Sequence, residues 1–410
     1  MKAVVFTLGC KVNSCESASL MTGLKELGYE VSDRLGFADL YIINTCAVTG
    51  EAEKKSRQTI ARARKFNKDA KIIVTGCASQ KSPEDFLKKE GVTLVTGTNS
   101  KDKIIDELEK EGLIIWEEKD YYEKYLPENP DKTRAYIKVQ DGCNNFCSYC
   151  IIPYLRGRTR SRNPDKVIEE VLRLNPLEAV ITGINLSAYN YQNIGLKGLI
   201  DRLSVVKCRI RLGSLEVGVV TEELLNSLKG LYNFAPHFHL SLQSGANATL
   251  KAMNRRYTRE EYFEKCELIK KHFPSAAITT DVIVGYSTET QADFEESVDL
   301  CKRVGFADIH CFPYSKREGT VGAKLKELPS SVKDERMDVL LAVKKELKDS
   351  FIKANLTKIF EVIPEDREGE YLVGYTENYI KVYLSCHNAE GAVRVRLVSQ
   401  YGEGALGEIV

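Results

Sequence analysis

The sequence has no long run of apolar residues and almost no net charge. No apolar run approaches the roughly 18 residues that a membrane-spanning helix needs, so we expect no membrane segment. The 59 lysines and arginines nearly balance the 58 aspartates and glutamates, so any nucleic-acid surface must come from local clusters of charge. With 43% hydrophobic and 29% charged residues, the composition excludes a disordered or fibrous chain.

Signals for export and for a hydrolytic triad are also missing. The N-terminal MKAVVFTLGCK has no cationic segment followed by a long apolar core and a cleavage site, so we expect a cytoplasmic protein. Histidine is rare and shows no Ser–His–Asp pattern, and we interpret the five copies as strand or surface residues. They are His237, His239, His272, His310 and His387.

Cysteine, in contrast, is plentiful, with twelve copies. In a reducing compartment, clustered cysteines more often bind metals or take part in catalysis than form disulfides. Cys143, Cys147 and Cys150 lie close together, whereas Cys10, Cys46 and Cys77 are widely spaced. The other six lie singly and are interpreted as small core residues. They are Cys15, Cys208, Cys266, Cys301, Cys311 and Cys386.

Residues 1–115 alternate between apolar, Val- and Ile-rich runs and helix-like segments. The runs AVVFTLGC, ADLYIINTC and AKIIVTGC predict strands of a parallel sheet that is covered on both faces. All three runs end in cysteine. Because the carboxyl ends of parallel strands share one edge, Cys10, Cys46 and Cys77 are expected to meet there.

Residues 116–133 are charged, contain two prolines and predict a linker. From 134 to 345 the alternation resumes, which predicts six βα units arranged as an incomplete (βα) barrel, with the chemistry at the carboxyl ends of its strands. The strands are expected near 134–140, 178–183, 208–213, 237–242, 277–284 and 307–312, and a long helix near 333–353 closes this part.

Residues 346–410 carry short alternating runs, KIFEVIPE, YLVGYTE, YIKVYLS and AVRVRLVS, separated by Gly, Asn and Glu. This pattern predicts a small antiparallel β-barrel. From residue 353 onward the segment holds six basic residues against nine acidic ones, so its net charge does not favour RNA. Contact with RNA would depend on shape, on aromatics such as Tyr375 and Tyr379, or on the Arg394/Arg396 pair.

The sharpest motif is the C-x3-C-x2-C cluster of Cys143, Cys147 and Cys150, which follows a predicted strand. Three thiolates can ligate three irons of a 4Fe–4S cube and leave the fourth iron open for a small molecule. A structural zinc site would need a fourth ligand, and no cysteine or histidine stands at a suitable spacing. The motif resembles that of radical S-adenosylmethionine enzymes, including the aromatic Tyr149 before the third cysteine.

With the second trio added, the chain resembles the methylthiotransferases along its whole length. The matching segments are TLGCKVN at 7–13, NTCAVT at 44–49, TGC at 75–77 and CNNFCSYCIIPYLRGRTRSR at 143–162. The resemblance implies an N-terminal cluster domain, a central radical domain and a C-terminal TRAM domain. It also implies two 4Fe–4S clusters, an auxiliary one on Cys10, Cys46 and Cys77 and a radical one on the C-x3-C-x2-C cysteines.

The activity implied by the resemblance is radical sulfur insertion followed by methyl transfer, with S-adenosylmethionine as radical source and methyl donor. Lys11 and Val12 resemble the branch that acts on N6-threonylcarbamoyladenosine at position 37, beside the tRNA anticodon. The alternatives are isopentenyladenosine in tRNA, a ribosomal-protein aspartate, or a non-enzymatic protein that binds zinc and RNA. The implied partners are a tRNA anticodon stem-loop and an electron donor such as flavodoxin or ferredoxin, and we expect a monomer.

Softer matches implied by the same resemblance place the S-adenosylmethionine contacts. They are Tyr149, Gly183, Gln243, Asp281 and Gly285, the last four of them in the segments VITGIN, HLSLQSG and DVIVGYSTET. The chain departs from the family pattern at Ser241, at Val217 and at Ser287-Thr288, in the loops that the resemblance places around the adenine.

Arg156, Arg158, Arg160 and Arg162 alternate along the chain, so an extended segment would turn all four guanidinium groups to one side. We predict that this row binds RNA phosphates or the carboxylate of the modified base. The helix after Cys46 is also basic, with Lys54, Lys55, Arg57, Arg62, Arg64 and Lys65, a pattern that solvated helix faces share.

Overall fold

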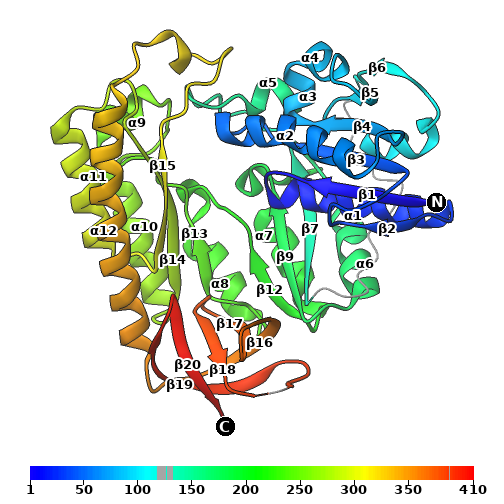
Figure 1. The fold of residues 1–410 in the computed structure, drawn as a ribbon. Helices are drawn as coiled ribbons and strands as arrows, with labels where there is room; N and C mark the ends of the chain where they lie inside the picture. The colour runs from blue at the N-terminus through cyan, green and yellow to red at the C-terminus, as the bar shows by residue number, and fades with distance from the viewer. Residues whose placement is uncertain (118–125, 127–132, 387) are drawn as a thin grey trace.

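The N-terminal part forms the predicted parallel sheet (Figure 1). The computed structural model describes residues 1–117, 126, 133–386 and 388–410, so nearly all of the predicted linker lies outside the described residues. Six parallel strands follow the order β2-β1-β3-β4-β5-β6. They are β1 (Lys2–Thr7), β2 (Glu30–Ser32), β3 (Leu40–Thr45), β4 (Lys71–Gly76), β5 (Val92–Thr96) and β6 (Gly112–Ile114).

Helices cover both faces of this sheet, as the unbroken apolar strands predict. Tyr41 and Ile43 of β3 pack in one core cluster with helix α2 (Gly50–Phe66). Their neighbours Leu40 and Ile42 point to the opposite face and pack in another cluster with helix α1 (Lys11–Glu26). A strand that is buried on both sides needs apolar residues at every position, which explains why these strands show no alternation.

The six strands predicted for the central part are present. They form two sheets with the orders β12-β9-β7-β8 and β13-β14-β15, joined by isolated parallel bridges. The main strands are β7 (Arg134–Asp141), β9 (Glu178–Gly183), β12 (Arg209–Leu212), β13 (His237–His239), β14 (Ala277–Val284) and β15 (Asp308–Pro313). β8 (Arg160–Ser161) pairs antiparallel with β7.

Helices cover these central strands on the outside (Figure 1). They include α6 (Pro164–Leu174), α7 (Leu196–Arg202), α8 (Glu222–Gly230), α10 (Arg259–His272), α11 (Gln291–Val304) and α12 (Ser330–Asn355). The boundary predicted between residues 345 and 346 falls inside α12, so the central and C-terminal parts share one continuous helix. Within the described residues, no helix is both long and apolar enough to span a membrane.

The C-terminal residues form a closed five-stranded barrel with the order β16-β17-β18-β20-β19. Its strands are β16 (Ile359–Glu368), β17 (Tyr371–Thr376), β18 (Lys381–Leu384), β19 (Val393–Tyr401) and β20 (Gly404–Ile409). The prediction of a purely antiparallel barrel is wrong at one seam, because β18 and β20 pair in parallel. β19 lies between β18 and β20 in the chain and forms an antiparallel hairpin with β20. β20 therefore runs in the same direction as β18, and the parallel pairing of these two strands closes the barrel.

A buried carboxylate, Glu178, connects the central strands with the C-terminal barrel. Glu178 accepts hydrogen bonds from Arg211 at 2.9 and 2.8 Å and also pairs with Arg134. Arg211 in turn donates to the carbonyl oxygens of Thr376 and Glu377 in the barrel. These arginines hold the pKa of Glu178 at about 2 against the opposing effect of its burial.

Tyr375 and Tyr379, predicted as RNA-stacking aromatics, instead pack against these same arginines. The Arg134 guanidinium lies 4.9 Å from the centre of the Tyr375 ring, and that of Arg211 lies 4.7 Å from the Tyr379 ring. Tyr379 also stacks on His237. The rings therefore stabilise the contact between the central strands and the barrel.

We predict that Glu178→Gln makes the free energy of unfolding less dependent on pH below pH 4.5. Because the folded pKa lies below the ordinary value of 4.5, Glu178 contributes stability at pH values above 4.5. That contribution, about 3 kcal/mol in full, is lost as the pH falls from 4.5 toward 2. Urea denaturation at pH 7, 5, 4 and 3 should show a smaller loss in the variant than in the wild type. A parallel decline in both proteins would contradict this role, and Glu169→Gln on the surface serves as control.

Candidate active site

Cys10, Cys46 and Cys77 follow strands β1, β3 and β4, which lie side by side in the sheet, and the structure brings the three thiols together. The Cys46 thiol interacts electrostatically with both Cys77 and Cys10. Residues up to 67 positions apart therefore meet at one edge of the sheet, as the sequence predicts. The cause is the parallel topology, which places all three carboxyl ends on the same side.

Glycines directly before two of these cysteines make the close approach possible. Gly9 has φ +106°, and a Cβ at this position would lie 2.9 Å from the sulfur of Cys46. Gly76 has φ +108°, and its Cβ would lie 2.4 Å from the carbonyl oxygen of Thr45. Only glycine fits either position without displacing the chain. The TLGC and TGC segments thus reflect a steric requirement of the thiol site.

Burial disfavours the ionised form of these thiols. It raises the pKa of Cys46 to about 11, and it raises that of Cys77 although the Arg156 guanidinium opposes the effect. Metal ligation requires the thiolate. The positive metal ions of a cluster would stabilise the buried thiolates, for which the protein supplies too little positive charge. This donor set therefore fits an iron–sulfur cluster.

The second trio lies in the loop between β7 and helix α5 (Ile152–Arg156). Other loops anchor its backbone, since the Ser148 amide donates to the Met253 carbonyl at 3.0 Å and the Ser148 carbonyl accepts from the Gly322 amide at 2.6 Å. Burial, with smaller contributions from the neighbouring thiols Cys147 and Cys143, raises the pKa of Cys150 to about 12. The three sulfurs therefore share one small volume and again fit a metal cluster better than free thiols.

Two side chains outside the loop donate hydrogen bonds to its sulfurs. Arg255 Nη1 lies 3.3 Å from the Cys147 sulfur, and Asn185 Nδ2 lies 3.7 Å from that of Cys143. Glu216 holds Arg255 with a 3.0 Å ion pair. Such donors stabilise the negative charge of ligating thiolates. No local pattern around these three residues reveals the role, because each acts across more than 38 positions of sequence.

A buried ion-pair network joins the two thiol sites. Arg156, at the end of α5, donates to Glu16 of α1 at 2.8 Å and to Asp141 of β7 at 3.0 Å. The same guanidinium donates to Asn13 at 2.7 Å and hydrogen bonds to the Cys77 thiol. Lys138 also bridges Glu16 and Asp141, at 3.0 Å from each. Arg156 therefore contacts Cys77 of the N-terminal trio, and its helix α5 directly follows the Cys143, Cys147 and Cys150 trio.

Comparison with known proteins agrees with this geometry. Residues 2–97 match the family described as uncharacterized protein family UPF0004, and residues 137–301 match the radical SAM superfamily. The threonylcarbamoyladenosine tRNA methylthiotransferase MtaB of Bacillus subtilis (strain 168) is 40% identical over 408 residues, covering 93% of this chain and 90% of the relative. That of Aquifex aeolicus (strain VF5) is 38% identical, covering 93% and 96%.

The chain belongs to the radical S-adenosylmethionine methylthiotransferases of the MtaB type. A tRNA-2-methylthio-N(6)-dimethylallyladenosine synthase of Thermodesulfovibrio yellowstonii is less similar, at 32% identity over 98% of this chain and 97% of the relative. Among solved structures, the radical S-adenosylmethionine methyltransferase TsrM from Kitasatospora setae matches with a TM-score of 0.57 at 14% identity, covering 78% of this chain and 74% of that one. That likeness shows the radical SAM fold. The cofactors of this methylthiotransferase are two 4Fe–4S clusters and S-adenosylmethionine, as expected.

The five residues predicted to contact S-adenosylmethionine lie around the central strands. Tyr149 packs beside Met253, Tyr286 and Tyr314, and Gly183 ends β9, where a Cβ would lie 2.9 Å from that of Gln140. Gln243 has φ +70° and forms a backbone bridge to β14, and Asp281 lies within that strand. Gly285, with φ +72°, faces Lys333 of α12. Their assignment to the cofactor stays a prediction.

The prediction that Arg156, Arg158, Arg160 and Arg162 turn their guanidinium groups to one side as an RNA-binding row is wrong. Arg156 and Arg162 are only 1% and 8% exposed, and Arg162 pairs with Glu170. Arg160 is bound to Asp141 at 3.0 Å, and Arg158 alone is exposed, 4.6 Å from the centre of the Phe146 ring. The segment is not extended throughout, because α5 includes Arg156 and buried carboxylates attract its neighbours. Alternation in sequence could not reveal acidic partners that lie elsewhere in the chain.

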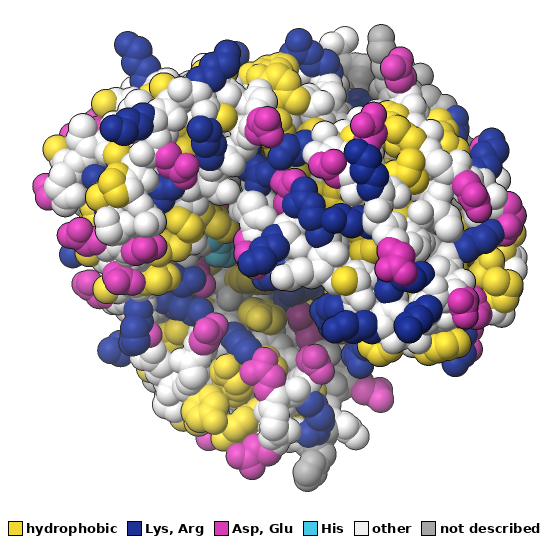
Figure 2. Space-filling view, turned by 45° about the horizontal axis from the view of Figure 1, so that its top comes forward, with side chains coloured by type: hydrophobic (Ala, Val, Ile, Leu, Met, Phe, Trp, Pro, Cys, Tyr) yellow, Lys and Arg dark blue, Asp and Glu magenta, His cyan; other side chains and the backbone are white. Residues whose placement is uncertain are grey.

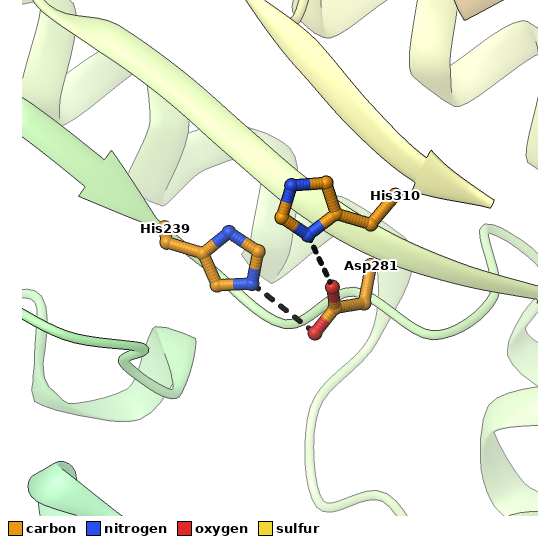
Figure 3. Close-up of side chains that lie close together, drawn as sticks. All are labelled: His239, Asp281 and His310. Carbon is orange, nitrogen blue, oxygen red and sulfur yellow. Dashed lines mark hydrogen bonds and ion pairs between the residues drawn. The ribbon is translucent and has the colours of Figure 1, made fainter. Parts of the chain in front are cut away.

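Two of the histidines, His239 and His310, gather around Asp281, although the sequence shows them scattered (Figure 3). His239 Nε2 lies 3.1 Å from one carboxylate oxygen, and His310 Nδ1 lies 3.1 Å from the other. His237 joins through Thr279, whose hydroxyl lies 3.0 Å from a nitrogen of both His237 and His239. Neighbouring strands β13, β14 and β15 supply these side chains, which explains the convergence. His387 lies outside the described residues.

We predict that Arg156→Met destabilises the protein by roughly 3–5 kcal/mol, because it leaves the Glu16 and Asp141 carboxylates buried beside fewer cations. Chemical denaturation of the reconstituted protein would measure this loss. The exposed neighbour provides the control, since Arg158→Met should change the stability by less than about 0.5 kcal/mol. Equal stability of the two variants would show that the network contributes little.

Proposed function

We propose that this protein is a tRNA methylthiotransferase that converts N6-threonylcarbamoyladenosine at position 37, next to the anticodon, to its 2-methylthio derivative. The observation that carries the proposal is the presence of two separate three-cysteine sites, linked through Arg156, in a chain of the MtaB type. Two such sites suit a reaction in which one centre generates a radical and another holds sulfur. When bound, the two clusters and S-adenosylmethionine supply hydrogen abstraction, sulfur and the methyl group.

The chain's own residues would hold and tune these groups. Cys143, Cys147 and Cys150 would ligate the radical cluster, and Cys10, Cys46 and Cys77 the auxiliary one. Arg255 and Asn185 donate to sulfurs of the first site, and Arg156 donates to one of the second. Arg255 is itself held by an ion pair with Glu216, and Arg156 by ion pairs with Glu16 and Asp141, which orients both guanidinium groups toward the sulfurs.

The finer architecture follows the same proposal. The two central sheets would form the incomplete barrel of the radical domain, with the N-terminal domain above the carboxyl ends of the strands (Figure 1). The C-terminal barrel would act as a TRAM domain at the opposite end. The expected partners are a tRNA anticodon stem-loop and a flavodoxin or ferredoxin as electron donor, and the expected form is a monomer in the cytoplasm.

Substitution of single cysteines separates the two sites. We predict that Cys46→Ala abolishes methylthiolated product but leaves release of 5′-deoxyadenosine largely intact, because the radical cluster keeps all its ligands. Cys147→Ala should abolish both. Mass spectrometry of the nucleosides and chromatography of 5′-deoxyadenosine, with chemical reductant supplied, would measure the outcome. Full methylthiolation by Cys46→Ala, or loss of 5′-deoxyadenosine release in a folded variant that keeps one cluster, would contradict the division. Cys266→Ala, a core cysteine, is the control.

A basic hollow supports contact with RNA in place of the arginine row. Lys81 of the N-terminal domain and Lys316, Arg317 and Lys324 after β15 line a volume of about 680 Å³. Arg317 is 5% exposed and pairs with Glu53, yet its Nε and Nη1 atoms have no hydrogen-bond partner among the described residues. These two nitrogens are themselves buried, so the exposed Lys316 and Lys324 are the cations of this hollow that suit phosphate oxygens. Lys and Arg side chains also lie along the rim of the adjacent hollow between the domains (Figure 2).

We therefore predict that Lys316→Ala combined with Lys324→Ala weakens tRNA binding and lowers the slope of log affinity against log salt by about one per lost phosphate contact. Filter binding at several salt concentrations would measure both quantities. Lys302→Ala, an exposed lysine near the end of α11, should leave them unchanged. An unaltered slope in the double variant would exclude phosphate contact at this hollow.

A further inference from the structure

One cation near the thiol sites lacks a counter-ion. Lys11 is the first residue of α1 and directly follows Cys10. Its side chain reaches solvent, and its ammonium interacts electrostatically with groups from the central strands, namely Arg211, Arg134, Glu178 and Asp281. Among the described residues, however, no carboxylate lies within ion-pair distance of this ammonium. Lys11 therefore extends from the auxiliary thiol site toward the central strands without a partner of its own.

The acidic groups nearby are already engaged. Glu178 is bound by Arg211 and Arg134, and Asp281 accepts hydrogen bonds from His239 and His310. A positive charge among carboxylates that are all occupied attracts an anionic ligand. No nearby carboxylate is therefore left to pair with Lys11, and an anionic ligand would supply the missing partner.

His310 provides a second polar contact in the same volume. Its Nδ1 donates to Asp281, so the ring is fixed and Nε2 is left without a partner in the described structure. The side chain is 53% exposed, against 24% for Asp281 and 10% for His239. Figure 3 shows both imidazoles directed at the carboxylate, and Figure 2 shows a histidine inside the hollow between the domains.

The position relative to the two thiol sites identifies the ligand. Lys11 adjoins Cys10, and the Asp281 carbonyl accepts from the amide of Gln243 in the loop that follows β13. In that loop, Ser241 accepts from Arg255, the same arginine that contacts the Cys147 sulfur. Lys11 thus adjoins one thiol site, and Asp281, which holds His310, is hydrogen-bonded to the loop that contacts the other. An RNA phosphate would remain on the outer surface, whereas a substituent on the base would reach this depth.

We propose that Lys11 binds the terminal carboxylate on the N6 substituent of the target adenosine, and that His310 accepts a hydrogen bond from an N–H or hydroxyl group of the same substituent. The inference rests on the proposed function and adds the residues that recognise the substrate. Lys11 supplies the opposite charge, and the free Nε2 of His310, oriented by the hydrogen bond from Nδ1 to Asp281, supplies a directed hydrogen-bond acceptor. A dimethylallyl group has no polar atom to satisfy either residue, so the same pair disfavours apolar substituents.

The test compares two anticodon stem-loop RNAs, one carrying the N6-threonylcarbamoyl group and one carrying its methyl ester, which lacks the charge. For holoenzyme with both clusters, Lys11→Met should raise KM for the acid about tenfold or more and leave KM for the ester unchanged. Lys11→Arg should retain most of the preference for the acid. His310→Gln should raise KM for the acid by a smaller factor, without changing release of 5′-deoxyadenosine.

Controls separate this inference from its alternatives. Lys25→Met, on the same helix, should behave as wild type, and equal iron content would show that Lys11→Met retains both clusters. Equal losses on acid and ester, or no loss, would overturn the proposal. So would uptake of Mn²⁺ by wild type but not by His310→Gln in EPR titration, because His239, Asp281 and His310 would then be metal ligands. If wild type modifies neither RNA, the proposed function itself fails.

Discussion

The contact between Arg156 and Glu16 holds the catalytic architecture together. It is a fully buried ion pair, and its two residues belong to different domains, 140 positions apart in sequence. Replacing such a pair with apolar residues is often neutral for stability, so its value here lies in position rather than in energy. A guanidinium fork that reaches Glu16, Asp141 and Asn13 at once permits only one arrangement of the two domains.

The relation between the two thiol sites follows from that constraint. Asn13, which accepts from Arg156, also donates to the carbonyl oxygens of Leu8 and Thr45, directly beside the strand ends that carry Cys10 and Cys46. Arg156 itself ends the helix that follows Cys150. A shift of either domain would break several hydrogen bonds between buried groups, and this makes the separation of the sites a property of the fold.

Paired and unpaired charged side chains lie in different parts of the molecule. At the lower end, Glu178 and three arginines join the central strands to the C-terminal barrel, and cation–π contacts with Tyr375 and Tyr379 complete that junction. Elsewhere, the ammonium of Lys11 has no carboxylate within ion-pair distance among the described residues, and Lys316 and Lys324 after β15 are exposed. The charges at domain junctions are therefore paired, and the charges left over are those that we propose to bind RNA or its modified base. The net charge of +1 conceals this division.

The sequence by itself determined the two cysteine trios, the parallel N-terminal sheet, the six central strands and the family. These features depend on local patterns, because apolar runs set strands and parallel strands place their ends at one edge. Only the tertiary structure decided which charges are free. Arg156 and Arg162 look like surface residues until Glu16 and Glu170 are found opposite them. Likewise, His239 and His310 meet at Asp281 only because β13, β14 and β15 are neighbours. Contacts between residues that are distant in sequence produce no periodic pattern, so the sequence of one segment could not predict them.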